Sequence, residues 1–317
     1  MPRTAGIHHV TSVAGSAQGN VEFYAGRLRL RLVKRTVNFD DPRTWHLYYG
    51  DRTGSPGTLI TFFPWQRLPP GRPGAGEVAV TSYAVPRGVL AEWREALEIE
   101  DEPSERFGRP VVEFRDTDGG RLELVEVDVG DGGSEVDEES GTGDGIRGFH
   151  GVTLSVARPE PTARLLADIL GYEALGEEEG RLRLAAAGDG AARFVDVLAA
   201  PDAERARLGA GSVHHVAFRA RDDEEQAAFR EELLVAGVDV TPVRDRQYFR
   251  SIYFREPGGA LFEIATDPPG MLIDEPVETL GSELRLPPWY EPDRARIEAA
   301  LPPITGPGGR GEGPAGS

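Results

Sequence analysis

The sequence predicts an α+β fold built from four βαβββ modules that pair into two halves. Four segments repeat one order of features: a strand-like run, a helix-like run, and then two or three further strand-like runs. The opening runs alternate polar and apolar residues or are rich in β-branched residues, whereas the second runs space apolar residues by three and four positions. The length of 317 residues corresponds to about two domains.

The first two modules form the N-terminal half. The first is expected to contain a strand, a helix and three strands, at 6–15, 17–28, 30–39, 44–51 and 57–64. The second opens with a strand, continues with a helix and ends in a strand, at 76–86, 88–98 and 119–127.

The last two modules form the C-terminal half. The third is expected to run strand, helix, strand, strand at 148–159, 161–172, 181–187 and 192–200. The fourth runs strand, helix and a long strand-forming segment at 211–222, 224–237 and 248–268. The two helices stop near Gly171 and Gly237, because glycine accepts the left-handed conformation that ends a helix.

Composition also divides the chain. The segment 126–148 is acidic, rich in glycine and nearly free of bulky apolar residues, which is typical of an exposed linker. Residues 286–301 indicate a turn and a short helix that packs back on the body. We therefore predict domains at 1–128 and 148–301, a linker at 129–147 and a disordered tail at 302–317.

The charge of the chain excludes several classes of partner. With 53 Asp and Glu against 35 Lys and Arg, the net charge is −18, which argues against nucleic acids and anionic membranes. There is no cysteine, so disulfides, zinc–thiolate sites and thiol nucleophiles are excluded. No signal-peptide or membrane-spanning stretch is evident, so we expect a cytoplasmic protein. The acidity fits either a high-salt habitat or a GC-rich genome that favours Arg over Lys.

The histidines suggest a metal site. Of six histidines, four form two His-His pairs, IHHVT and VHHVA, at the start of the first and fourth modules. Equivalent strand positions in related modules converge on one point, and Glu263 in the last strand offers a carboxylate that is costly to bury without a partner. Two histidines and one carboxylate form a facial triad that suits Fe(II) and leaves positions for substrate and O₂.

At these residues the chain resembles the vicinal oxygen chelate superfamily of glyoxalases, bleomycin-resistance proteins and extradiol dioxygenases. More narrowly, it is similar to the branch that opens the ring of hydroquinones. This resemblance implies two glyoxalase-like domains with curved mixed sheets. The segments that carry it are HHVTSVAG, VKRTVNFDDPRTWHLYYGD, GTLITFFPW, GSVHHVAFRA, DRQYFRSIYFREPGGALFEIATDPPG and LPPWYEPDRARIEAALPPI.

The resemblance implies an Fe(II)-dependent extradiol-type dioxygenase that cleaves hydroquinone or substituted hydroquinones and incorporates both atoms of O₂. It assigns one Fe(II) per chain to His9, His215 and Glu263, with Mn(II) as the less favoured metal. It also implies catalytic roles for His8, His214, Tyr253 and Arg246, and substrate binding by Thr11, Arg246 and Tyr253. The expected partners are a small aromatic substrate and O₂; the oligomeric state, including a homo-oligomer, stays open.

Several residues and functions keep an alternative interpretation. His46 is expected to be a packed core residue, and His8 and His214 should point away from their neighbours by strand alternation. Glu123 and His150 occupy positions that match Glu263 and His9, as the remnant of a second site one ligand short. A glyoxalase-like lyase or isomerase, or a binding protein that sequesters a quinone or drug, would have the same fold.

Overall fold

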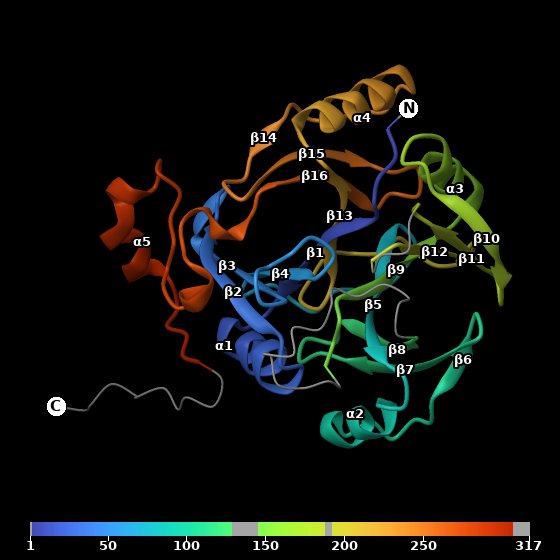
Figure 1. The fold of residues 1–317 in the computed structure, drawn as a ribbon, viewed down its shortest axis with the longest axis horizontal. Helices are drawn as coiled ribbons and strands as arrows, with labels where there is room; N and C mark the ends of the chain where they lie inside the picture. Colours follow the sequence, from blue (N-terminus) through green and yellow to red (C-terminus); the bar gives the residue numbers. More distant parts are fainter. Residues whose placement is uncertain (1, 129–144, 188–191, 307–317) are drawn as a thin grey trace.

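The computed structural model describes residues 2–128, 145–187 and 192–306. The strands form two curled mixed sheets, and the helices lie on the outer sides of these sheets (Figure 1). The predicted α+β class with curved mixed sheets is therefore confirmed. Most of the predicted linker at 129–147 and of the predicted disordered tail at 302–317 lies outside the described residues.

The first sheet joins the first module to the fourth. Its eight strands run in the order β14-β15-β16-β13-β1-β4-β3-β2, and β1 and β13 pair antiparallel at its centre. The first module supplies β1 (Ile7–Ala14), β2 (Arg31–Asn38), β3 (Asp41–Gly50) and β4 (Leu59–Pro64). The fourth supplies β13 (Val213–Ala220), β14 (Arg244–Asp245), β15 (Phe249–Arg255) and β16 (Leu261–Pro269).

The second sheet joins the second module to the third in the same way. Its order is β10-β11-β12-β9-β5-β8-β7-β6, with β5 and β9 antiparallel at its centre. Its strands are β5 (Glu77–Pro86), β6 (Ser104–Arg106), β7 (Arg109–Arg115), β8 (Arg121–Val127), β9 (Phe149–Val156), β10 (Glu173–Glu178), β11 (Arg181–Ala185) and β12 (Phe194–Ala199). Each sheet thus combines one module before residue 129 with one after residue 147, and the domain boundaries stay a prediction.

The helices follow the predicted segments, with one difference. The helix expected at 17–28 divides into α1 (Ala17–Val21), capped by the Ser16 hydroxyl, and a π-helix, η1 (Glu22–Arg27). The other helices are α2 (Leu90–Leu97), α3 (Pro159–Asp168) and α4 (Asp223–Val235). The Asp222 carboxylate accepts the Glu225 N–H and caps α4, as expected for an acidic residue at a helix start.

Three strands of the second sheet were not predicted: β6 and β10, which form its two edges, and β7, which lies between β6 and β8. The short β6 and the whole of β10 are charged and largely exposed, and β7 carries its apolar residues in only part of its length. An edge strand needs no continuous apolar face, because it forms by pairing with its neighbour. The hydrophobic pattern therefore gave no signal for β6 and β10, and only a short one for β7.

The segment that follows β16 is bonded to the first sheet. Lys34 in β2 is fully buried, and its Nζ lies 2.6 Å from both Asp274 Oδ1 and Glu275 Oε2. The Tyr290 hydroxyl donates to the Phe39 carbonyl at 2.8 Å, and the helix predicted near the C-terminus is α5 (Arg294–Ala300). Among the described residues, no helix is both long and apolar enough to cross a membrane.

Candidate metal centre

Three adjacent strands of the first sheet bring His9, His215 and Glu263 together. His9 on β1 pairs with Ala217 on β13, and Ala217 pairs with Glu263 on β16. His215 lies two residues before Ala217, on the same side of β13. Cross-strand partners point to one face of a sheet, so the three side chains meet there. We call this concave face, around these three residues, the first cup.

The three side chains converge closely. His215 Nε2 lies 2.8 Å from Glu263 Oε2, His9 Nε2 lies 3.4 Å from the same oxygen, and the two Nε2 atoms lie 3.4 Å apart. All three side chains are buried, and one ligand atom from each falls within 4.8 Å of the others. Each residue can supply one metal ligand.

The donor atoms fit a metal ion. Glu263 Oε2 is buried and makes no hydrogen bond, even though His215 Nε2 is near it. The other carboxylate oxygen accepts the Ser251 hydroxyl at 2.5 Å. Burial alone would raise the pKa of Glu263, but His9 and His215 hold it well below its usual range. A charged oxygen without a hydrogen bond, beside two imidazole nitrogens, suits a small hard-to-borderline cation such as Fe(II).

His8 and His214 each contact one of the two converging imidazoles. His8 Nδ1 lies 2.9 Å from His9 Nδ1, and His214 Nδ1 lies 2.7 Å from His215 Nδ1. The expectation that strand alternation points them away is wrong, because the β1–β13 register shifts at both positions and each residue sits in a β-bulge. Such partners orient a ligating ring and fix its tautomer.

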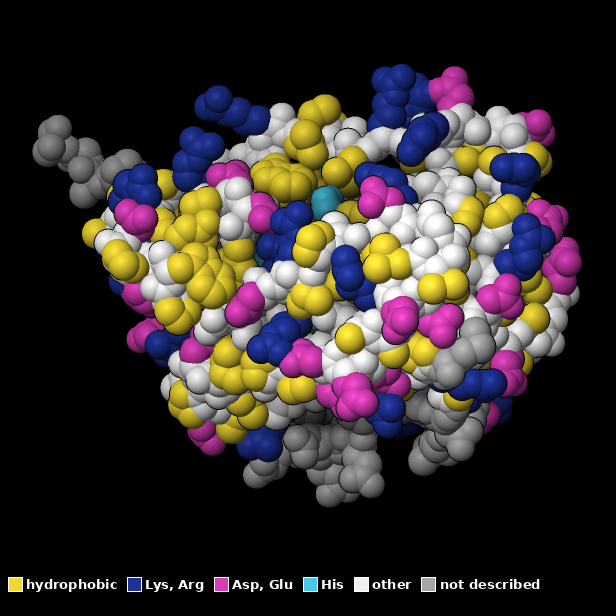
Figure 2. Space-filling view, turned by 90° about the horizontal axis from the view of Figure 1, so that it is seen from above, with side chains coloured by type: hydrophobic (Ala, Val, Ile, Leu, Met, Phe, Trp, Pro, Cys, Tyr) yellow, Lys and Arg dark blue, Asp and Glu magenta, His cyan; other side chains and the backbone are white. Residues whose placement is uncertain are grey.

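A cavity of about 250 Å³ opens in front of these residues. Among the predicted site residues, Thr11, His214, Arg246 and Tyr253 line it, whereas His8 does not. Its remaining walls are mostly aromatic, and the full lining is His9, Thr11, Asn38, Phe39, Asp40, His46, Tyr48, Phe63, Trp65, His214, His215, Arg246, Phe249, Tyr253 and Glu263. In the space-filling view, a histidine surface is visible between hydrophobic and basic side chains (Figure 2).

Arg246 and Tyr253 form the polar side of this cavity. Arg246 Nε donates to the Tyr253 hydroxyl oxygen at 3.1 Å, and its Nη2 donates to Asp40 Oδ2 at 3.0 Å. Burial and the nearby Glu263 raise the pKa of Tyr253 far above its usual value, so it stays a neutral phenol. Burial, then His215, lowers the pKa of His214 to about 3, so His214 is neutral.

Sequence reasoning missed the role of His46 in this wall. His46 was expected to be a core residue, but it lines the cavity and bonds to Thr61 Oγ1 and to the Tyr48 hydroxyl, each at 2.9 Å. The His46 ring also contacts the rings of Tyr48 and Phe63. Only the register of β3 against β4 places His46 here, and that register was not visible in the sequence.

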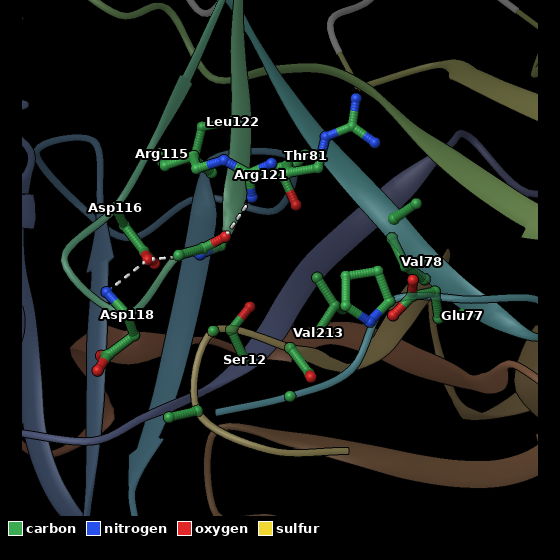
Figure 3. Close-up of a pocket in the computed structure, with 18 of the residues that line it drawn as sticks. Ser12, Glu77, Val78, Thr81, Arg115, Asp116, Asp118, Arg121, Leu122 and Val213 are labelled. Atoms are coloured by element: carbon green, nitrogen blue, oxygen red, sulfur yellow. Dashed lines mark hydrogen bonds between the residues drawn. The ribbon is translucent and has the colours of Figure 1, made fainter. Parts of the chain in front are cut away.

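A second cavity, of about 270 Å³, has no comparable group of converging metal-ligand side chains among its described lining residues. It lies between the two sheets and is bordered by Glu77, Asp116 and Asp118 (Figure 3). Asp116 turns back on its own hairpin, accepts the N–H groups of Asp118 and Gly120, and binds the Tyr24 hydroxyl at 2.8 Å. Its carboxylate is therefore already satisfied, and the cavity marks a joint between modules.

The expected remnant of a second site needs one correction. Glu123 on β8 pairs with Ser82 on β5 as Glu263 pairs with Ala217, so it does match Glu263. The residue that pairs with Ser82 from β9, however, is Gly151, which therefore occupies the position of His9. His150 matches His8 instead, because the shift in register falls there. We call the face around Glu123 the second cup.

Comparison with known proteins identifies the family. Residues 148–264 match the model of the Glyoxalase/Bleomycin resistance protein/Dioxygenase superfamily. A Bacillus subtilis (strain 168) protein, named provisionally as the ring-cleaving dioxygenase MhqO, is 49% identical over 305 residues, which cover 95% of this chain and 97% of that protein. The chlorohydroquinone/hydroquinone 1,2-dioxygenase of Sphingobium indicum is 38% identical, over 91% of this chain and 93% of its own.

Solved structures agree with this relationship. A crystal structure of a provisionally named dioxygenase from Bacillus subtilis is 47% identical, covers 96% of this chain and 99% of its own, and superimposes with a TM-score of 0.89. A glyoxalase I variant from Zea mays, only 14% identical, covers 83% of this chain and 94% of its own with a TM-score of 0.62. The second likeness confirms the glyoxalase-like fold alone.

Proposed function

Because the chain belongs to the ring-cleaving dioxygenases of the glyoxalase/bleomycin resistance protein/dioxygenase superfamily, we propose that it is an Fe(II)-dependent extradiol-type enzyme. Its proposed substrates are hydroquinone and substituted hydroquinones, whose ring it opens with O₂. The observation that carries this proposal is the convergence of His9, His215 and Glu263 at the base of an aromatic-walled cavity. The chlorohydroquinone/hydroquinone dioxygenase of Sphingobium indicum supports the choice of substrate.

In this proposal His9, His215 and Glu263 hold one Fe(II) per chain, with Mn(II) as the less favoured metal. Bound iron supplies the redox chemistry that brings O₂ and an electron-rich ring together. A set of three ligands leaves coordination positions for both partners. His8 and His214, through their Nδ1 contacts, hold the two ligating rings in the required orientation.

The remaining polar residues would bind and orient the ring. The two hydroxyls of a hydroquinone are para to each other, so only one can reach the metal, and orientation must come from the protein. Arg246 keeps its charge, since Tyr253 and Asp40 hold its pKa above the usual range despite burial. Beside Tyr253 it stabilises an ionised ring oxygen. Thr11 faces the same space, and His214 is better placed than His8 to exchange a proton with the substrate.

The aromatic wall explains how a small planar substrate is retained. Phe39, Phe63, Trp65 and Phe249 line the cavity, and Phe249 also packs against His9 with ring centroids 4.9 Å apart. Flat apolar walls stack on an aromatic ring and exclude water from it. They would favour hydroquinones over charged substrates of similar size.

The direct test is oxygen consumption by the iron-loaded enzyme. The protein is loaded with Fe(II) without air and then given O₂ with hydroquinone, catechol or a methylglyoxal–thiol adduct. Uptake of O₂ with hydroquinones, accompanied by a ring-opened product, supports the proposal. Isomerisation of the thiol adduct without O₂ would replace it by a glyoxalase-like lyase, and binding without turnover would indicate a quinone-binding protein.

The proposal also includes a location in the cell and a division into domains. The enzyme would act in the cytoplasm on a small aromatic substrate. The two domains would comprise 1–128 and 148–301, with the linker at 129–147 between them. Limited proteolysis tests this division, since cleavage at the linker should leave two fragments that stay associated through the shared sheets.

A further inference from the structure

A chain of four hydrogen-bonded side chains crosses the wall of the first cup. Thr11 Oγ1 lies 2.8 Å from Thr61 Oγ1, Thr61 Oγ1 lies 2.9 Å from His46 Nε2, and His46 Nδ1 lies 2.9 Å from the Tyr48 hydroxyl. We propose that these residues form a neutral proton relay, with His46 as its central member and both ends open to the substrate cavity. The proposal rests on the function proposed above and assigns a role to Thr61, His46 and Tyr48, which that function does not use.

The strand register builds this chain. Thr11 on β1 pairs with Thr61 on β4, and Thr61 pairs with Tyr48 on β3. His46 lies two residues before Tyr48, so both side chains leave β3 on the same face. Three neighbouring strands therefore place four polar groups side by side on the face that forms the cavity wall.

Burial determines which members of the hydrogen-bonded series a substrate can reach. Thr11, His46 and Tyr48 line the cavity, whereas Thr61 is fully buried behind them and is not part of the lining. Thr61 connects Thr11 to His46, and substrate does not need to touch it. The ring centroids of Tyr48 and Phe63 lie 4.1 and 4.4 Å from that of His46. This packing holds both His46 nitrogens toward their hydrogen-bond partners.

The protonation state of the members allows transfer without charge. Burial, then His9 and His215, lowers the pKa of His46 well below its usual value, so the ring is neutral. Burial raises the pKa of Tyr48 well above its usual value, so its hydroxyl keeps its proton. A neutral imidazole carries one donor and one acceptor nitrogen, and the two exchange roles when the tautomer changes.

The transfer balances at every atom. A substrate hydroxyl gives its proton to the Tyr48 oxygen, and the Tyr48 proton moves to His46 Nδ1. The proton on Nε2 moves to Thr61 Oγ1, the Thr61 proton moves to Thr11 Oγ1, and the Thr11 proton leaves to an oxygen of the reacting substrate. Each broken bond to hydrogen is matched by one that forms, and no member changes its charge. After the product leaves, a transfer in the opposite direction, which takes a proton from water at Thr11 and releases one to water at Tyr48, restores the starting tautomer.

The sharpest test removes the buried hydroxyl alone. Thr61→Val is isosteric and does not alter a side chain that lines the cavity. Substrate affinity, followed by quenching of tryptophan fluorescence, should therefore stay within about twofold of wild type. The kcat for hydroquinone should fall about 10–100-fold, and the solvent deuterium isotope effect on kcat should decrease. Thr61→Ser, which restores the hydroxyl, should recover most of the rate.

Thr36→Val is the matched control. Thr36 lies opposite His46 on β2 and is fully buried, and its hydroxyl makes no hydrogen bond. This variant should keep the wild-type kcat and isotope effect. A wild-type rate and isotope effect in Thr61→Val, or a Thr61→Ser protein as slow as Thr61→Val, would overturn the relay but leave the proposed function intact. A wild-type enzyme that opens no hydroquinone ring would overturn both.

Discussion

The two cups are built on the same strand pattern but hold different chemistry. In each sheet, two central antiparallel strands are flanked by a strand that carries a buried glutamate, Glu263 in the first cup and Glu123 in the second. At the positions of His9 and His215, the second cup has Gly151 and Val80. Two exchanged residues therefore separate a candidate metal centre from a site with one ligand.

An arginine compensates for the missing ligands. Arg106 occupies the position in the second sheet that Arg246 occupies in the first. In the second cup, however, it forms an ion pair with Glu123. Glu123 also accepts the Ser82 hydroxyl at 2.6 Å. The guanidinium thus provides the positive charge that a buried carboxylate requires, a role that the proposed function assigns to a metal ion in the first cup.

The positions of the proposed relay differ in the same way. Where the first cup has Thr61 and Tyr48, the second cup has Asp196 and Arg183, which form a bidentate ion pair at 2.8 Å. Arg181 takes the place of His46 and donates to Thr153 Oγ1 at 2.6 Å. Fixed charges stabilise a fold, whereas neutral groups that exchange protons suit a reaction. Under the proposed function, the comparison teaches that the same scaffold can carry the chemistry on one face and stabilising ion pairs on the other.

The largest expected contrast comes from removing each glutamate. Glu263→Ala should lower metal affinity by more than about 100-fold and abolish ring cleavage. Glu123→Ala should leave metal content and activity unchanged but lower the free energy of unfolding by about 1–3 kcal/mol, because Arg106 loses a buried partner. Metal analysis after Fe(II) loading, O₂ uptake and urea unfolding measure these effects. Ring cleavage at the wild-type rate in Glu263→Ala would remove the distinction between the cups.

The second prediction tests the buried contact that Asp274 and Glu275 make with Lys34 of the first sheet. Lys34→Met should lower the free energy of unfolding by about 3–5 kcal/mol, because Asp274 and Glu275 lose their buried cation. Arg294→Met is the control: its ion pairs with Glu291 and Glu298 are surface contacts, so it should cost less than about 1 kcal/mol. Equal losses in urea unfolding would show that the buried cluster does not stabilise the first sheet.

The third prediction asks why the second cup has glycine where the first has His9. A Cβ on Gly151 would lie 2.4 Å from the Phe194 carbonyl oxygen, so Gly151→Ala should cost about 1–3 kcal/mol. Gly19→Ala, where the new atom meets nothing closer than 3.5 Å, should cost nothing. For the same reason, combining Val80→His with Gly151→His should add no second metal ion. A second equivalent of bound metal in that variant would contradict this account.

The smallest effect is a pH dependence in the second cup. Burial first, then Arg183, Arg109 and Arg193, lower the pKa of His150 well below 6.5. The unfolded chain binds this proton more readily, so the stability due to neutral His150 is present above the unfolded pKa and is lost as pH falls below it. In His150→Leu, the loss of stability between pH 7.5 and 5.5 should shrink by about 1.4 kcal/mol. Identical pH profiles for the two proteins would disprove the assignment.

The sequence by itself determined the modules and the composition of the first cup. The alternation of strands and helices, the two His-His pairs and Glu263 are local signals, because each depends on neighbours within a few residues. The structure brings together the residues that this pattern singled out, His9, His215 and Glu263, with Thr11, Arg246 and Tyr253 around them. The family resemblance added which histidine of each pair is the expected ligand.

Only the tertiary structure decided how the modules pair and in which register. The pairing of β1 with β13 joins segments about two hundred residues apart, and no local pattern specifies such a partner. Register then controls every further assignment, since a shift by one residue turns a side chain to the other face of the sheet. The bulges at His8 and His214 and the place of Gly151 rather than His150 opposite Ser82 follow from such long-range pairings. The entry of His46 into the cavity follows from the register of β3 against β4.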